Sequence, residues 1–300
     1  MSSFLQRVQY VPVLGIGIST EYGASATSGA LDIFALRKAY PEFATFLEIG
    51  VEVVKGLDTT AQRWTQDGLP TTYHFLDINL DEAEDFDEPW QAAVERLARQ
   101  IRPAWLCGDA GLWHFGRRER GHMLLLPPIL SAEAARSQAE GIVRLRERLG
   151  YEVFPENPPG HVFLGNLHIL EFFAAVTERA DTGMLLDCAH LAMYQRQMGY
   201  APCTALREFP LERIVELHVA GSTQKTHDGF VYWDDDHTPQ VLADTWQIFE
   251  WVVPKAPNLK AVVFECERNA LASVIPGLQR IAATVAPTAL ARCRPGEGRR

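Results

Sequence analysis

Short apolar runs alternate along this chain with longer segments of amphipathic pattern. The apolar runs, which are typical of buried strands, cover residues 11–18, 46–54, 71–78, 104–107, 151–154, 184–186, 214–217 and 261–264. The amphipathic segments, which are typical of helices, include residues 90–100, 131–149, 167–179, 241–253 and 270–285. Strands that alternate with helices of this length predict βαβ units and a parallel sheet. Eight such strands predict an α/β fold, a closed (β/α)8 TIM barrel.

The chain has no low-complexity linker and no repeat of solenoid period. Its 300 residues, 47% of them hydrophobic, can bury a large core. We therefore expect one barrel domain over residues 1–290. Residues 291–300 are basic and contain helix breakers, so we expect a disordered tail there.

Charge and composition narrow the classes of partner and compartment. A net charge of −10 argues against a nucleic-acid partner. The N-terminus lacks a signal-peptide pattern and no apolar run reaches the length of a membrane span, so we expect a cytoplasmic protein that does not bind membranes. The cysteines are odd in number, dispersed and without CxxC spacing, which argues against disulfides and a zinc–thiolate site. They are Cys107, Cys188, Cys203, Cys266 and Cys293.

Most of the predicted strands end in a carboxylate or an imidazole. In a (β/α)8 barrel the carboxyl ends of all strands converge on one face, so these side chains are expected in one small volume. They are His74, Asp109, Glu156 with Asn157, Asp187 followed by His190, His218, and Glu265 with Glu267 close behind. Asp235 and His237 are expected in the loop that follows the seventh strand.

The types of these residues indicate metal binding. Carboxylates packed together without cations repel one another and lose their hydration, and bound cations remove that cost. Histidine, aspartate, glutamate and asparagine without cysteine suit Fe(II), Mn(II) or Zn(II). The donors exceed the needs of one ion, which predicts two or three ions. The stretch 216–240 alone would also fit a structural histidine and a solvated acidic turn, and it is the set of strand ends that favours a metal site.

Six motifs, in order and spacing, carry a family resemblance: YHFLDINL, FPENPPG, MLLDCAHL, ELHVAG, WDDDHTP and FECE. In these motifs the chain resembles the multinuclear non-heme iron-dependent oxidases, which include the methanobactin oxazolone–thioamide enzyme and an enzyme of thiaglutamate assembly. The resemblance implies a xylose-isomerase-like barrel, two or three iron ions and O2 as co-substrate. It also implies modification of ribosomally made peptides, often at cysteine, usually with a partner protein that presents the substrate.

The resemblance also implies a set of metal ligands. These are His74, Glu156, Asp187, His190, His218, Asp235, His237 and Glu265, with Asn157 beside Glu156 as a further ligand or a supporting group. Glu48 and Glu52 match the acidic second strand of the family, and Glu267 replaces its usual aspartate. The fourth strand departs from the family, because Ala110 stands where a histidine is expected. We expect Asp109, His114 or both to supply the missing ligand; the alternative is that both are structural.

The leading interpretation is an iron- and O2-dependent oxidase that modifies a peptide or a related small substrate in natural-product biosynthesis. One alternative is a redox-neutral divalent-metal enzyme on the same barrel, either a sugar isomerase or a phosphodiesterase. An isomerase should place a lysine beside the metals, but Lys225 alone lies near a strand end. The other alternative is a non-catalytic barrel that binds a peptide, against which the intact donors on five strands argue.

Overall fold

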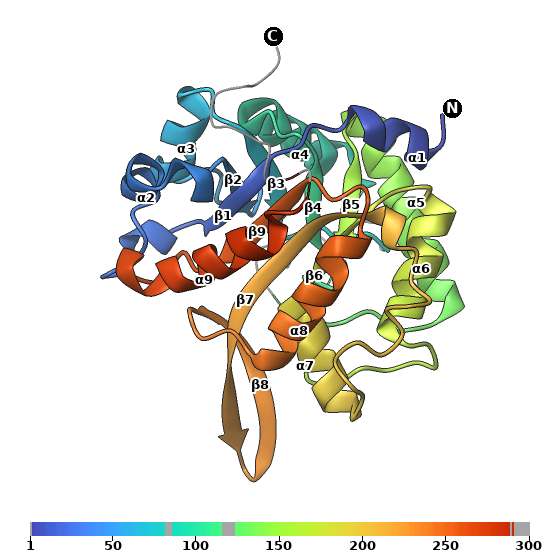
Figure 1. The fold of residues 1–300 in the computed structure, drawn as a ribbon. Helices are drawn as coiled ribbons and strands as arrows, with labels where there is room; N and C mark the ends of the chain where they lie inside the picture. The colour runs from blue at the N-terminus through green and yellow to red at the C-terminus, as the bar shows by residue number, and fades with distance from the viewer. Residues whose placement is uncertain (1, 82–85, 116–123, 289, 291–300) are drawn as a thin grey trace.

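The computed structural model describes residues 2–81, 86–115, 124–288 and 290 (Figure 1). Eight parallel strands among these residues form a closed barrel, in the order β1-β2-β3-β4-β5-β6-β7-β9 and back to β1. Their bounds are β1 Gly15–Glu21, β2 Phe46–Val51, β3 Thr71–Phe75, β4 Leu106–Asp109, β5 Val153–Glu156, β6 Met184–Asp187, β7 Ile214–His227 and β9 Ala261–Glu265. The predicted (β/α)8 barrel is confirmed. The predicted tail, 291–300, lies outside the described residues and stays a prediction.

Most helices cover the outside of the barrel, and α1 lies at its amino-terminal end (Figure 1). They are α1 Phe4–Arg7, α2 Ile33–Ala39, α3 Thr59–Gln66, α4 Glu88–Ile101, α5 Ala132–Leu149, α6 Ile169–Ala180, α7 Cys188–Met198, α8 Ala243–Val252 and α9 Leu271–Val285. Residues at both ends of α5 explain its limits. The Ser131 side chain caps the first turn, and Gly150, with φ of 74°, ends the helix. None of the helices in the described ranges is long and apolar enough to cross a membrane.

The core has two parts, one on each face of the barrel wall. The outer part packs the helices against the strands. The inner part fills the amino-terminal end of the barrel and includes Phe46, Cys107, Phe154 and Leu185. Phe4 of α1 closes this end, with its ring edge-on to that of Phe154 at 6.3 Å. The carboxyl-terminal end of the barrel interior is thereby left to polar side chains.

The seventh strand is longer than predicted. β7 continues past the barrel to His227 and pairs with antiparallel β8, Phe230–Thr238, in a hairpin that projects from the barrel (Figure 1). Asp228 and Gly229 form the two-residue turn with φ of 47° and 80°, the positive values of a type I′ turn, whose twist suits a hairpin. The predictions that the strand ends at His218, and that Asp235 and His237 lie in a loop, were wrong.

Candidate metal centre

The polar cluster forms because side chains alternate along a strand. Residues two apart face the same side, so the residue two positions after each inner apolar residue also faces the barrel interior, nearer the carboxyl-terminal mouth. Glu48, Asp109, Glu156, Asp187 and Glu265 follow in this way the inner residues Phe46, Cys107, Phe154, Leu185 and Val263. All five carboxylates are buried, as are His74 and His218.

Four groups of donor atoms overlap at this level of the barrel. Within each group, one donor atom per residue lies within 4.8 Å of the others. The groups are Glu48–His74–His218, His74–Asp109–Glu156, Glu156–Asp187–His190 and Asp187–His218–Glu265. Each group shares a residue with another, so the arrangement can hold more than one ion.

His218 lies at the centre of these contacts. Its Nε2 is 3.0 Å from Oε1 of Glu48, and its Nδ1 is 3.3 Å from Oε1 of Glu156. Neither contact has the alignment of a hydrogen bond, so both ring nitrogens are buried without a hydrogen-bond partner. The same holds for Oδ1 of Asp109 and Oδ2 of Asp187. Buried polar atoms in a native protein are normally paired, and metal ions bound here would satisfy these donors.

The protonation of the cluster also indicates a cation site. Burial, together with nearby carboxylates, raises the pKa of Asp187 to about 7 and that of Asp109 well above its usual range. Burial alone would lower the pKa of His74, but the hydrogen bond with Glu156, at 2.7 Å, and the surrounding carboxylates raise it to about 9. Without cations the cluster therefore holds protons, and bound cations would take their place.

The β7–β8 hairpin brings two further candidates over the mouth. Oδ2 of Asp235 is 3.0 Å from Nε2 of His190 and 3.3 Å from Nε2 of His237. Nδ1 of His237 lies 2.9 Å from Oε1 of Glu267, and the other oxygen of Glu267 accepts a hydrogen bond from Ser19 at 3.0 Å. Glu267 thus fixes the orientation of the His237 ring, as carboxylates do for metal-binding histidines.

Asn157 is committed to the backbone of a neighbouring strand. Its Nδ2 donates to the carbonyl of Asp187, and its Oδ1 accepts from the amide of Asp187, both at 3.0 Å. Its own carbonyl lies 2.9 Å from Nδ1 of His190. Of the two roles expected for Asn157, this geometry favours support of Asp187 and His190.

The fourth strand presents Asp109 to the cluster. Asp109 faces the interior two residues after Cys107, whereas Ala110 packs in the outer core. Gly108 allows this close packing, because a Cβ there would lie 2.6 Å from the carbonyl oxygen of Phe75. His114 is buried but belongs to none of the donor groups found among the described residues. The geometry favours Asp109 over His114, whose role as a ligand stays a prediction.

Sequence reasoning missed three residues near the cluster. Glu48 was matched to the family but not counted as a ligand, and it forms a further donor group with Cys107 and Glu216. Nε1 of Trp105 donates to Oε2 of Glu216 at 2.7 Å, and burial followed by the charge of Glu48 raises the pKa of Glu216 to about 8. The available signal was spacing, because Cys107 and Glu216 precede Asp109 and His218 by two residues.

A pocket opens onto one side of the cluster. Among the residues that the structure describes, no lysine or arginine lines it; the lining residues are Ser19, Thr20, Glu21, Glu48, Gly50, His74, His237, Glu265 and Glu267. The lysine expected of a sugar isomerase is therefore absent from this lining.

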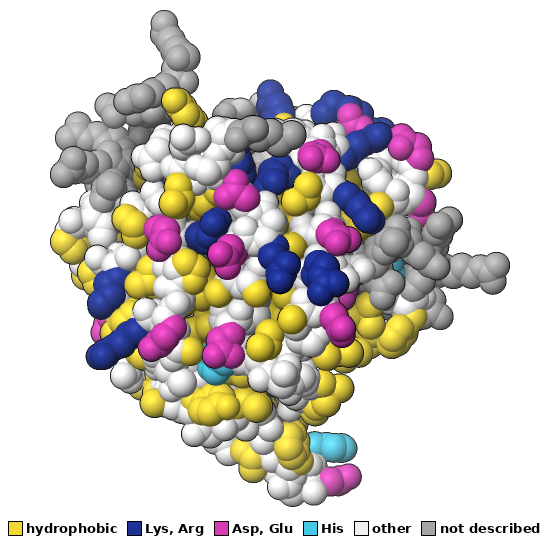
Figure 2. All heavy atoms as spheres, turned by 90° about the vertical axis from the view of Figure 1, so that its right-hand side faces the viewer, with side chains coloured by type: hydrophobic (Ala, Val, Ile, Leu, Met, Phe, Trp, Pro, Cys, Tyr) yellow, Lys and Arg dark blue, Asp and Glu magenta, His cyan; other side chains and the backbone are white. Residues whose placement is uncertain are grey.

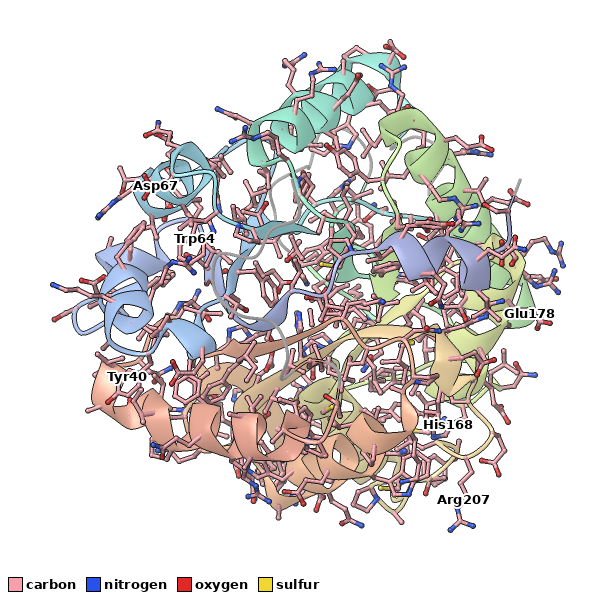
Figure 3. All side chains as sticks on the ribbon, turned by 45° about the horizontal axis from the view of Figure 1, so that its top comes forward. Tyr40, Trp64, Asp67, His168, Glu178 and Arg207 are labelled. Atoms are coloured by element: carbon pink, nitrogen blue, oxygen red, sulfur yellow. The ribbon has the colours of Figure 1, made fainter. Side chains whose placement is uncertain are left out.

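Other histidines lie apart from the cluster. His168 caps α6 in the outer layer of the molecule (Figure 3). The ring of His161 packs against Tyr232 at 4.7 Å, and the side chain of His227 is 83% exposed beside the hairpin turn. His122 lies outside the described residues.

Comparison of the sequence with known proteins finds a matching family. The profile described as "RiPP precursor modification enzyme MbnB/TglH/ChrH" matches residues 31–286. A UPF0276 protein of Neisseria meningitidis serogroup B is 25% identical over 264 residues, which cover 87% of this chain and 88% of that protein. A UPF0276 protein of Anaeromyxobacter sp. is 28% identical over 199 residues, which cover 65% of this chain and 68% of that protein.

Solved structures share the barrel at low sequence identity. A xylose isomerase-like TIM barrel protein from Mycobacterium smegmatis, in complex with magnesium, is 11% identical with a TM-score of 0.55, covering 95% of this chain and 100% of that one. An AP endonuclease of family 2 from Brucella melitensis is 14% identical with a TM-score of 0.51, covering 91% of this chain and 98% of that one. These likenesses support the xylose-isomerase-like fold alone.

Proposed function

Because the chain belongs to the family of RiPP precursor modification enzymes MbnB/TglH/ChrH, we propose that it is an O2-dependent oxidase that uses two or three iron ions to modify a peptide. The observation that carries the proposal is the set of four overlapping, buried donor groups in the barrel mouth. Their imidazole and carboxylate donors suit non-heme iron. The choice of iron and O2 rests on the family resemblance.

The residues of the chain have distinct parts in this proposal. His74, His218, Asp187 and Glu156 would hold the ions, and bound iron would supply the oxidation chemistry. The remaining task of the protein is to fix the donors and to exclude water. Asn157 does the first by holding the backbone of Asp187, and the buried core beneath the cluster does the second.

The surface around the mouth supports a peptide substrate. The loop after β5 and the β7–β8 hairpin both follow carboxyl ends of strands, and they meet where His161 packs on Tyr232. This rim exposes large apolar side chains, among them Val162, Leu164 and Phe230. Figure 2 shows the right-hand side of Figure 1, where charged side chains lie over the upper and middle parts and mainly hydrophobic and uncharged ones lie below them, toward the hairpin. Such a rim suits a peptide, alone or presented by a partner protein.

The experiment is elemental analysis of protein made in iron-supplied cells. We expect more than one iron per chain, and loss of iron in Asp187→Ala and His218→Ala with the circular dichroism of the barrel retained. His227→Ala is the matched control, because this histidine is exposed beside the hairpin turn, and it should keep its iron. One zinc with negligible iron would overturn the proposal and favour a redox-neutral hydrolase.

A further inference from the structure

A fifth donor group lies directly beneath the cluster, deeper in the barrel. Glu48, Cys107 and Glu216 each place one donor atom within 4.8 Å of the other two, and all three are buried. They come from β2, β4 and β7, so three separate strands meet at this point. This group differs from the four above it because it contains a thiol.

Glu48 belongs to both levels. Its Oε1 lies 3.0 Å from Nε2 of His218 in the upper cluster. Its Oε2 accepts hydrogen bonds from Sγ of Cys107 at 3.2 Å and from Oγ1 of Thr72 at 3.3 Å. The two oxygens of one carboxylate therefore face different donor groups, which is the arrangement of a bridging ligand.

Glu216 supplies an oxygen that no hydrogen bond satisfies. Its Oε2 accepts from Nε1 of Trp105 at 2.7 Å, which leaves Oε1 buried and without a hydrogen-bond partner. A buried oxygen without a partner is destabilising, and a bound cation would remove that cost. The oxygen thus provides an observation that is independent of the clustering of the three side chains.

We propose that Glu48, Cys107 and Glu216 form a deeper subsite for a thiophilic divalent cation of the Zn²⁺, Co²⁺ or Fe²⁺ class, joined to the upper cluster through Glu48. In a tetrahedral shell with sulfur at about 2.3 Å and oxygen at about 2.1 Å from the ion, neighbouring donors lie roughly 3.5 Å apart. The 3.2 Å between Cys107 and Glu48 is close to that spacing. Binding replaces the S–H bond by an S–metal bond and releases the proton to solvent, with no change of oxidation state. The proposal rests on the metal chemistry proposed for the upper cluster.

The test is cobalt titration of full-length protein that a chelator has freed of metal. Wild type should develop the near-ultraviolet absorption of cobalt–thiolate charge transfer, which nitrogen and oxygen donors do not produce. Cys107→Ala should lose this band and about one Co²⁺ per chain, and Glu216→Gln, which keeps an acceptor for Trp105, should weaken it. Cys188→Ala is the matched control: this thiol is also fully buried but lies in no donor group found among the described residues, so band and count should persist.

The outcomes separate this subsite from the proposed function. Cobalt bound without a thiolate band, at equal stoichiometry in wild type and Cys107→Ala, would overturn the subsite and leave the upper cluster intact. A single cobalt with a full thiolate band would support the subsite and count against a multinuclear upper cluster. Circular dichroism of each variant shows whether it is folded, so that lost cobalt can be assigned to a lost ligand. If Cys107→Ala does not fold, Glu216→Gln takes its place in the comparison.

Discussion

Oε1 of Glu48 lies 3.0 Å from Nε2 of His218, although β2 and β7 are not neighbours in the barrel. The contact spans the interior, so it depends on closure of the sheet and not on strand pairing. Changing Glu48 to Ala removes a donor from the group that contains His74 and His218. We therefore expect Glu48→Ala to lower the metal content by at least one ion per chain and to lower activity at least tenfold.

Glu52 provides the matched control for Glu48. It lies near the end of the same strand and is buried, but it pairs with Lys55 and is in no donor group of the described residues. Glu52→Gln should retain its metal. Equal metal content in Glu48→Ala and wild type would show that Glu48 is not a ligand.

The barrel was predictable because its signal is local and repeated. Each strand is a short apolar run that ends in a polar residue, and the family motifs occur at these ends. Glu48 was harder to assign, because its role depends on His218, 170 residues away and on a strand that does not pair with β2. Spacing could have indicated that Glu48 faces inward, but not that it meets His218.

The hairpin was missed although its sequence signal was present. Asp228-Gly229 is a strong type I′ turn sequence, and Thr226 to Trp233 around it are rich in strand-forming residues. The polar residues of the segment favoured a loop instead. Its polarity is explained by its position, since the hairpin leaves the barrel and Gln224 to His227 are exposed.

We expect Gly221→Ala to detach the hairpin from the cluster. A Cβ at this position would lie 1.9 Å from the carbonyl oxygen of Thr238, so the backbone must move at the base of the hairpin. Asp235 and His237 would move with β8, and metal content should fall while the circular dichroism of the barrel persists. The control is Ser222→Ala, which removes a buried hydroxyl that has no hydrogen-bond partner and keeps the ladder. Metal loss in both variants would contradict the explanation.

Glu267 should act on metal affinity through His237. Glu267→Gln keeps an acceptor near Nδ1 of His237 but removes the charge that orients and polarises the ring. We expect metal affinity about 10- to 100-fold weaker, because outer carboxylates of metal-binding histidines have effects of this size. Ser19→Ala, which removes only the hydrogen bond to Glu267, should give a smaller change. Unchanged affinity in Glu267→Gln would mean that His237 does not bind metal.

The fourth strand offers a direct choice between two residues. Asp109 lies in a donor group with His74 and Glu156, whereas His114 lies in none found among the described residues. Asp109→Ala should therefore lower the metal content, and His114→Ala should leave it unchanged. The reverse result would show that the loop after β4 brings His114 to the cluster when metal binds.

Metal binding should tighten as pH rises. In the metal-free protein the pKa of His74 is raised to about 9 and that of Asp187 to about 7, so both groups carry protons at mildly acidic pH. Coordination requires the deprotonated forms, so each bound ion must displace protons.

Below these pKa values the apparent metal affinity should rise about tenfold per pH unit for each proton released, and above about pH 9 the gain from His74 should end. Competition with a coloured chelator between about pH 6 and about pH 8 measures this slope. His74→Gln should bind metal more weakly, and its affinity should change less steeply with pH, because the variant has no imidazolium proton to lose. An affinity that does not change with pH in the wild type would mean that His74 and Asp187 do not bind the metal.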